Sequence, residues 1–266
     1  MTSDVEAALN KIVGSATILR NPGGAGRIFE LYVMTGIACA LQVKGYDVWV
    51  QRSDGTRVHP ADTDRRFIQR GGSPTGIAPR AQGPNQASSI VFKWPTRPAW
   101  ALLNGIQFEG RSAASHELDL AIVPESVAQA LRAAPTGGKP KGRPRVAIEC
   151  KDVGANGSVD EMRAFVARLY DLTLLLAHHA HLGVAGPPRV IHPGAPVGPT
   201  HRPALTYWIE NRRTLNVIAR KAGFVSGAAA LTGYHAVRPY GGIEAGSGPA
   251  TQLMDDIADW IFARGY

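Results

Sequence analysis

Apolar residues along the chain follow two different rhythms, which predict helices alternating with strands. Between Ile28 and Val43, apolar side chains occur on nearly every side of a helical projection, as is typical of a buried helix. Shorter apolar runs bounded by turn residues are typical of strands. The pattern predicts strands at residues 46–51, 88–94, 101–110, 116–123, 145–151 and 205–210, and further helices within 4–19 and at 159–180, 214–223 and 255–265.

The order of these elements predicts one α/β domain over residues 1–266, with a mixed central β-sheet flanked by helices on both faces. We find no internal repeat and no linker that separates two domains. Two segments interrupt the regular pattern. Residues 52–87 are rich in Gly, Pro, Ser and Arg and are expected to form an insert, and residues 132–145 are expected to form a basic loop.

Composition narrows the choice of partner and compartment. The formal net charge of +8 favours a polyanionic partner, and 19% charged residues are too few for a disordered polyelectrolyte. Cys39 and Cys150 lie in apolar runs, as expected of buried thiols in a reducing compartment. We see no secretory signal at the N-terminus, and the apolar run at 169–180 is too short to cross a bilayer. We therefore expect a cytoplasmic protein that does not associate with a membrane.

Two of the predicted strands carry charged residues where a buried strand should carry none. Because side chains alternate along a strand, Glu149 and Lys151 should share one face of their strand, and Glu117 and Asp119 one face of theirs. If the two strands are neighbours, Asp119, Glu149 and Lys151 converge at one end of the sheet. The alternative is a set of strand-end charges at the surface, with a salt bridge between Glu149 and Lys151.

A third acid lies in the apolar helix. Glu30 is the only charged residue between Arg27 and Lys44, and its neighbours one turn away along the helix are apolar. Burying a carboxylate is costly unless something compensates its charge. The alternative is that Glu30 is a helix-start carboxylate near the positive end of the helix dipole.

Carboxylates that are brought together need a cation between them. Like charges raise each other's pKa, and a divalent metal removes this repulsion. Carboxylate and backbone oxygens suit Mg²⁺, which keeps several waters and binds phosphate oxygens. A lysine beside such a metal can orient or help to deprotonate an attacking water, and can offset charge in the transition state. The pattern of acids and lysine therefore indicates metal-assisted phosphoryl chemistry.

Asp119, the run Glu149-Cys150-Lys151 and the glutamate of GRIFE at Glu30 together resemble the PD-(D/E)xK nuclease superfamily, which has the restriction-endonuclease-like fold. The order of elements over residues 24–180 is also similar to that core. The family usually has a small residue or proline before the aspartate, where this chain has Leu118. The Gln-rich helix motif of the exonuclease branch is not evident in 159–180.

The resemblance implies metal-dependent hydrolysis of phosphodiester bonds with Mg²⁺, for which Mn²⁺ substitutes. Asp119 and Glu149 would be metal ligands, together with the backbone carbonyl of Cys150. Lys151 would activate the water or stabilise the transition state, and Glu30 would be a supporting ligand or base. By analogy of fold, we expect an endonuclease that cuts duplex DNA in restriction or defence, with DNA repair or recombination as the alternative. Cutting both strands would favour a homodimer.

The basic loop offers candidate contacts with nucleic acid. Lys139, Lys141, Arg143 and Arg145 are expected to bind phosphates, since this segment has no acid and joins the two strands of the site. The alternative is a solvated hairpin loop. The arginines of 52–87 are accompanied by aspartates, which leaves their role open.

Other motifs carry weaker hypotheses. Glu117 is a candidate extra metal ligand, and His116 is expected to be structural because alternation places it opposite Asp119. HELD lacks the second histidine of a zincin motif, and the histidines at 178, 179 and 181 lack partners for zinc. The Gly-rich NPGGAG turn before a helix leaves a nucleotide-binding α/β module as an alternative, although it lacks the full dinucleotide-binding motif. The remaining alternative is a non-catalytic DNA-binding module of the same fold.

Overall fold

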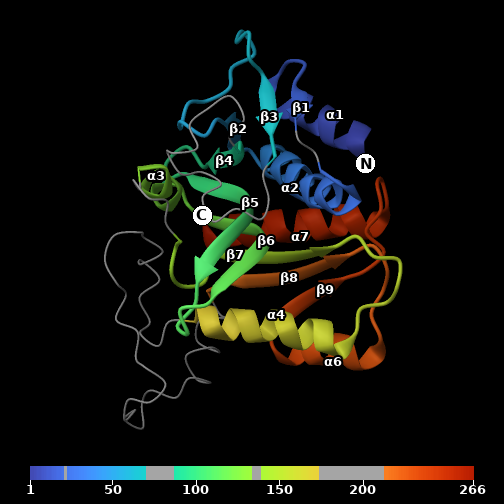
Figure 1. The fold of residues 1–266 in the computed structure, drawn as a ribbon. Coiled ribbons are helices and arrows are strands. Elements are labelled where there is room, and N and C mark those ends of the chain that lie inside the picture. The colour runs from blue at the N-terminus through green and yellow to red at the C-terminus, as the bar shows by residue number, and fades with distance from the viewer. Residues whose placement is uncertain (21–22, 70–86, 134–138, 174–212) are drawn as a thin grey trace.

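The computed structural model describes residues 1–20, 23–69, 87–133, 139–173 and 213–266 (Figure 1). The helices are α1 (Thr2–Val13), α2 (Ala25–Val43), α3 (Glu125–Ala133), α4 (Val159–Leu172), α6 (Ser226–Tyr234) and α7 (Gly248–Arg264). The strands are β1 (Ile18–Arg20), β2 (Asp47–Gln51), β3 (Arg66–Ile68), β4 (Ser89–Lys93), β5 (Trp100–Glu109), β6 (Ser115–Pro124), β7 (Val146–Lys151), β8 (Leu215–Arg220) and β9 (Val237–Tyr240).

One mixed sheet forms the centre of the molecule. Its strand order is β2-β4-β5-β6-β7-β8-β9. The pairs from β2 to β7 are antiparallel, and β7–β8 and β8–β9 are parallel. A separate small sheet pairs β1 with β3 in parallel. The predicted α/β architecture with a mixed sheet is confirmed.

Helices cover both faces of this sheet, and each face has its own apolar core. Figure 1 shows α2 and α7 on one side of the sheet and α4 and α6 on the other. The first core joins α1, α2 and α7 to side chains such as Leu120 and Ile148. The second core joins α3, α4 and α6 to side chains such as Ala121 and Ala147 on the opposite face. Alternate residues of β6 and β7 thus enter different cores, as a two-sided buried sheet requires.

The prediction of a helix at 214–223 is wrong, because residues 215–220 form strand β8 within the sheet. Every residue of β8 is buried. An apolar run of this kind fits a buried helix as well as a central parallel strand, and periodicity alone does not separate them. The strand β9 and the helix α6 were not predicted. Residues 174–180 and the predicted strand at 205–210 lie outside the described residues.

In the parts of the chain that the structure describes, no helix is both long and apolar enough to span a bilayer.

The helices α2 and α7 pack closely because α2 has a glycine at their contact. A Cβ atom on Gly36 would lie 2.1 Å from the sulfur of Met254 on α7. Gly233 in α6 has no atom within 4 Å of the equivalent position. The two glycines therefore differ in packing although both are helical.

We predict that Gly36→Ala is about 1–3 kcal/mol less favourable for stability than Gly233→Ala, because the end of the Met254 side chain must move to admit the methyl group. Gly233→Ala should be neutral or should stabilise the protein by about 0.5–1 kcal/mol through the higher helix propensity of alanine. Urea unfolding of both variants measures the difference. Equal stabilisation by both substitutions would show that the contact between α2 and α7 is looser than described.

Candidate active site

The backbone hydrogen bonding of the sheet is interrupted at Asp119. Strands β6 and β7 pair from Ile122↔Val146 to Leu120↔Ile148 and no further. On the other side of β6, the pairing with β5 skips Gly105 and Asp119 between two regular stretches. Asp119 therefore sits in the sheet without a backbone partner in either neighbouring strand.

The strands also turn over at this point. Along β6, Leu118 belongs to the core beneath α4, whereas Leu120 belongs to the core beneath α2. On β5, Leu102 and Ile106 are divided in the same way, and Gly105 between them has a φ of 57°, in the left-handed region that glycine tolerates. The alternation that we expected along this strand, with Glu117 and Asp119 on one face, is therefore interrupted at Asp119.

At this break, side chains take the place of backbone partners for both Cys150 and Asp119. The Oδ2 of Asp119 accepts a hydrogen bond from the backbone N–H of Cys150 at 2.7 Å. Its backbone carbonyl accepts one from Nδ2 of Asn104 at 3.0 Å. Burial, followed by repulsion from Glu149, raises the pKa of Asp119 to about 6, although the Cys150 hydrogen bond and the charge of Lys151 oppose the shift. The carboxylate of Asp119 is thus buried next to a second carboxylate, that of Glu149.

Glu149 and Lys151 lie on one face of β7, as alternation predicts. Glu149 is only 3% exposed, and its Oε1 lies 2.6 Å from Nζ of Lys151 and 2.6 Å from Nη2 of Arg168 on α4. Burial alone would lower the pKa of Lys151, but the charge and hydrogen bond of Glu149 raise it overall. The salt bridge of the surface alternative is present, but its carboxylate is buried in the domain.

The second oxygen of Glu149 has no partner. Among the described residues, Oε2 of Glu149 is buried and has no hydrogen bond. A buried carboxylate oxygen without a donor is costly, so such an atom has room for a water, a donor or a cation. The adjacent backbone of Cys150 helps to place one. The N–H and C=O groups of a strand residue face the same neighbour, so the Cys150 carbonyl faces the gap that Asp119 occupies.

Glu30 approaches the site from α2 on the other side of the sheet. Its Oε2 accepts a hydrogen bond of 2.6 Å from Asn104, the residue that also binds the Asp119 carbonyl. Burial raises the pKa of Glu30 to about 7, the hydrogen bond from Asn104 lowers it, and the charge of Asp119 raises it further. Glu30 is not in the first turn of α2, so it does not cap the helix. One amide therefore ties Glu30 and Asp119 together.

Gln69 completes this chain of hydrogen bonds and was not predicted. It is 2% exposed, and its Nε2 donates to Oδ1 of Asn104 at 3.2 Å and to the carbonyl of Arg27 at 3.0 Å. Asn104 was also missed, although an amide followed by glycine inside the apolar run ALLNGIQF could have marked it. Gln69 follows an irregular segment and carries no comparable signal.

The arrangement fits a hard divalent cation with few protein ligands. Within the described ranges, no group of three or more His, Cys, Asp or Glu side chains could hold a metal ion. Mg²⁺, however, is commonly bound by one or two carboxylates with waters and substrate phosphates. The unpartnered oxygen of Glu149 and the carboxylate of Asp119 suit that mode. Among the described residues, Glu30 and Glu117 do not form a group of three with either of them, and their roles as metal ligands stay predictions.

Two residues beside Asp119 secure the neighbouring helix. Nε2 of His116 lies 2.6 Å from Oδ2 of Asp171 at the end of α4, and the same oxygen accepts a hydrogen bond of 2.6 Å from Ser112. The carbonyl of Glu117 accepts a hydrogen bond from Arg168 at 3.0 Å. His116 thus joins strand β6 to α4, which agrees with its expected structural role.

Most of the basic side chains of the loop 139–145 contact groups of the same chain. Lys139 donates to Ser115, and Lys141 forms an ion pair of 2.6 Å with Glu109. The guanidinium of Arg145 lies over the ring of Tyr266, 5.4 Å from its centroid. These three side chains are half-buried rather than fully exposed.

Arg143 does not suit the phosphate-binding role that its position suggested. It is only 4% exposed and donates a hydrogen bond of 2.7 Å to Asn216 at the start of β8. A guanidinium buried in this way cannot reach a phosphate on the surface.

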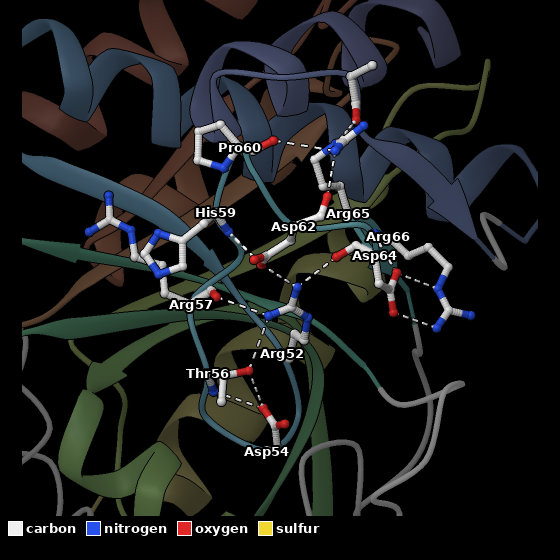
Figure 2. Close-up of polar contacts among 11 residues, drawn as sticks. Arg52, Asp54, Thr56, Arg57, His59, Pro60, Asp62, Asp64, Arg65 and Arg66 are labelled. Carbon is white, nitrogen blue, oxygen red and sulfur yellow. Dashed lines mark hydrogen bonds and ion pairs between the residues drawn. The ribbon is translucent and has the colours of Figure 1, made fainter.

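The arginines of 52–66 are engaged within the same chain (Figure 2). Arg57 pairs with Asp47 on β2 at 2.9 Å, and Arg65 donates to the carbonyl of Ala16. Arg52 lies at the centre of the loop, where it pairs with Asp62 at 2.6 Å and binds the carbonyls of Arg57 and Asp64. Arg66 pairs with Asp64 at 2.6 Å. These ion pairs and hydrogen bonds hold together the first part of the predicted insert, which leads into β3 and so to Gln69. Residues 70–86 lie outside the described part.

The glycine-rich turn is described only in part. Gly24 is the N-cap of α2, while residues 21–22 of NPGGAG and the histidines at 178, 179 and 181 lie outside the described residues.

Comparisons of the chain with protein-family models, with curated proteins and with solved structures returned no match.

We predict that Glu30→Gln stabilises the metal-free protein at pH 8 by about 1–3 kcal/mol more than at pH 5. The pKa of Glu30 in the folded protein, about 7, lies above the ordinary value of 4.5 for a glutamate. Folded protein therefore binds more protons than unfolded protein between these values, and stability falls as the pH rises through this window. Glutamine removes that loss.

Urea unfolding in EDTA at both pH values provides the measurement. Glu6→Gln on the exposed side of α1 is the control and should show no such difference. An equal effect of Glu30→Gln at pH 5 and pH 8 would contradict the raised pKa.

Proposed function

We propose that the chain is a metal-dependent nuclease that hydrolyses phosphodiester bonds, and that duplex DNA is its substrate in restriction or defence. The observation that carries this proposal is the buried, unpartnered Oε2 of Glu149 beside the carboxylate of Asp119. Lys151 lies on the same face of β7, 2.6 Å from the other oxygen of Glu149. Two acids and a lysine are thus held where two strands separate.

The residues that would hold Mg²⁺ or Mn²⁺ are Asp119 and Glu149, with the backbone carbonyl of Cys150 as a third oxygen. All three are oxygen donors, as these hard cations prefer. A metal bound here would lower the pKa of an attacking water and offset charge on the phosphate. The raised pKa of Asp119 supports the proposal, since a bound cation would relieve the repulsion that contributes to it.

Two further residues have the chemistry that hydrolysis needs. Lys151 is 31% exposed at its side chain and ends in an ammonium group that can donate to a phosphate oxygen. Glu30, with a pKa of about 7, can take up a proton near neutral pH. Asn104 binds only one oxygen of Glu30, so in this scheme Glu30 serves as a base or as a supporting ligand through the other.

The order of elements supports a restriction-endonuclease-like core. A helix with Glu30 precedes the strand of Asp119, which is followed by the strand of Glu149 and Lys151 and then by α4. The choice of duplex DNA and of a defence role rests on the resemblance to PD-(D/E)xK nucleases and on the net charge of +8. DNA repair or recombination is the alternative role, and cutting of both strands would favour a homodimer.

We predict that the protein cuts plasmid and linear duplex DNA with Mg²⁺ or Mn²⁺ and not with EDTA. Asp119→Ala and Lys151→Ala should each lower the cleavage rate by at least about a hundredfold, because each removes a group that acts on the metal or the reacting phosphate. Asp160→Ala is the matched control, since Asp160 is an 86% exposed acid on α4 away from these contacts.

Cleavage that requires metal and is lost in both variants supports the nuclease. Metal-independent, salt-sensitive binding of DNA without cleavage would favour the non-catalytic binding module. If the protein neither cuts nor binds DNA, the nucleotide-binding alternative at NPGGAG is favoured. Measuring the binding of ATP or NAD would test that alternative directly.

A further inference from the structure

Arg168 on α4 bridges the two strands of the site. Its Nη2 lies 2.6 Å from Oε1 of Glu149, and its Nη1 donates to the carbonyl of Glu117 at 3.0 Å. Its guanidinium also lies over the ring of Phe165, 5.5 Å from the centroid. The two strands diverge beyond Leu120, so Arg168 spans them where the ladder no longer joins them.

Arg168 and Lys151 share one oxygen of Glu149 but are held differently. The guanidinium is fixed at two nitrogens and by an aromatic face, and its planar fork has little freedom once both hydrogen bonds form. Within the described part of the chain, the ammonium of Lys151 contacts Glu149 alone. A flexible ammonium with one partner can leave it more readily than a guanidinium with several.

We propose that Arg168 is a positioning residue that fixes Glu149 through Oε1, so that Oε2 is presented to the divalent cation and Lys151 is able to leave the carboxylate and reach the substrate phosphate. This inference rests on the proposed function of the site. In this proposal Arg168 acts through Glu149 and not directly on the metal or the substrate.

Orientation and charge make opposite predictions at this position. A positive charge next to a cation site weakens cation binding, so loss of charge alone would tighten it. Loss of a residue that orients a ligand weakens metal binding by about 10–100-fold. Lysine keeps the charge of Arg168 but cannot form its two-pronged contact. Arg168→Lys and Arg168→Met therefore separate the two effects.

The test measures Mn²⁺ binding to the full chain without DNA, by electron paramagnetic resonance or calorimetry. We expect Arg168→Lys and Arg168→Met each to raise the Kd for Mn²⁺ by about tenfold or more. Both should also cut DNA more slowly at saturating metal, because Lys151 stays paired with Glu149. Arg163→Met, on the same helix and 67% exposed, should match the wild type in both measurements.

Val237→Ala is the control for a general loss of stability, because it removes packing from the buried face of the edge strand β9. Wild-type affinity in Arg168→Lys together with tighter binding in Arg168→Met would overturn the proposal in favour of charge alone. Unchanged affinity in both variants would also overturn it. Failure of the proposed function looks different, because the wild type itself would then neither bind Mn²⁺ nor cut DNA.

Discussion

The site depends on a single hydrogen bond between a side chain and the backbone. Where β6 and β7 separate, the N–H of Cys150 loses its place in the ladder and is met by the carboxylate of Asp119. Leaving that N–H unpaired would cost about 1–3 kcal/mol, so the carboxylate is part of the sheet's structure. The same interaction brings a negative charge into the interior, next to Glu149. The surrounding polar contacts, from Asn104 to Arg168, compensate for a charge that the sheet itself requires.

Sequence reasoning located the acids but not the groups that hold them. The alternation along β7 placed Glu149 and Lys151 correctly, because that strand is a regular central strand. The same reasoning failed on β6, where the pleat turns over at Asp119 and Gly105 has a positive φ. An argument from periodicity assumes a continuous strand and cannot predict such a break. The helix expected at 214–223 failed because burial on both sides removes the periodic signal.

Other residues were missed because their partners are distant in sequence. Gln69 reaches Asn104 across 35 residues, and Arg168 reaches Glu117 across 51. An arginine on an amphipathic helix is ordinarily a surface charge, so nothing local distinguishes Arg168 from Arg163. For the basic loop and the arginine-rich loop, the positive charge in the sequence exceeds what these loops leave free for a partner. The charge of the basic loop suggested nucleic acid, and the role of the arginine-rich loop was left open, whereas many of these charges bind carboxylates, carbonyls or rings of the same chain. Net charge therefore overstates the positive surface available to a partner.

The contacts between β6 and α4 have a consequence for how this region can vary in evolution. Ser112 and His116 fix Asp171, and the carbonyl of Glu117 fixes Arg168, one helical turn earlier. The strand advances about 3.3 Å per residue and the helix about 1.5 Å, so the two elements match only at one spacing. A single insertion or deletion between His116 and Asp119 would shift every later side chain to the other face. The segment can therefore tolerate substitutions but not a change in length. We expect the number of residues between His116 and Asp119 to be more constrained in evolution than their identity.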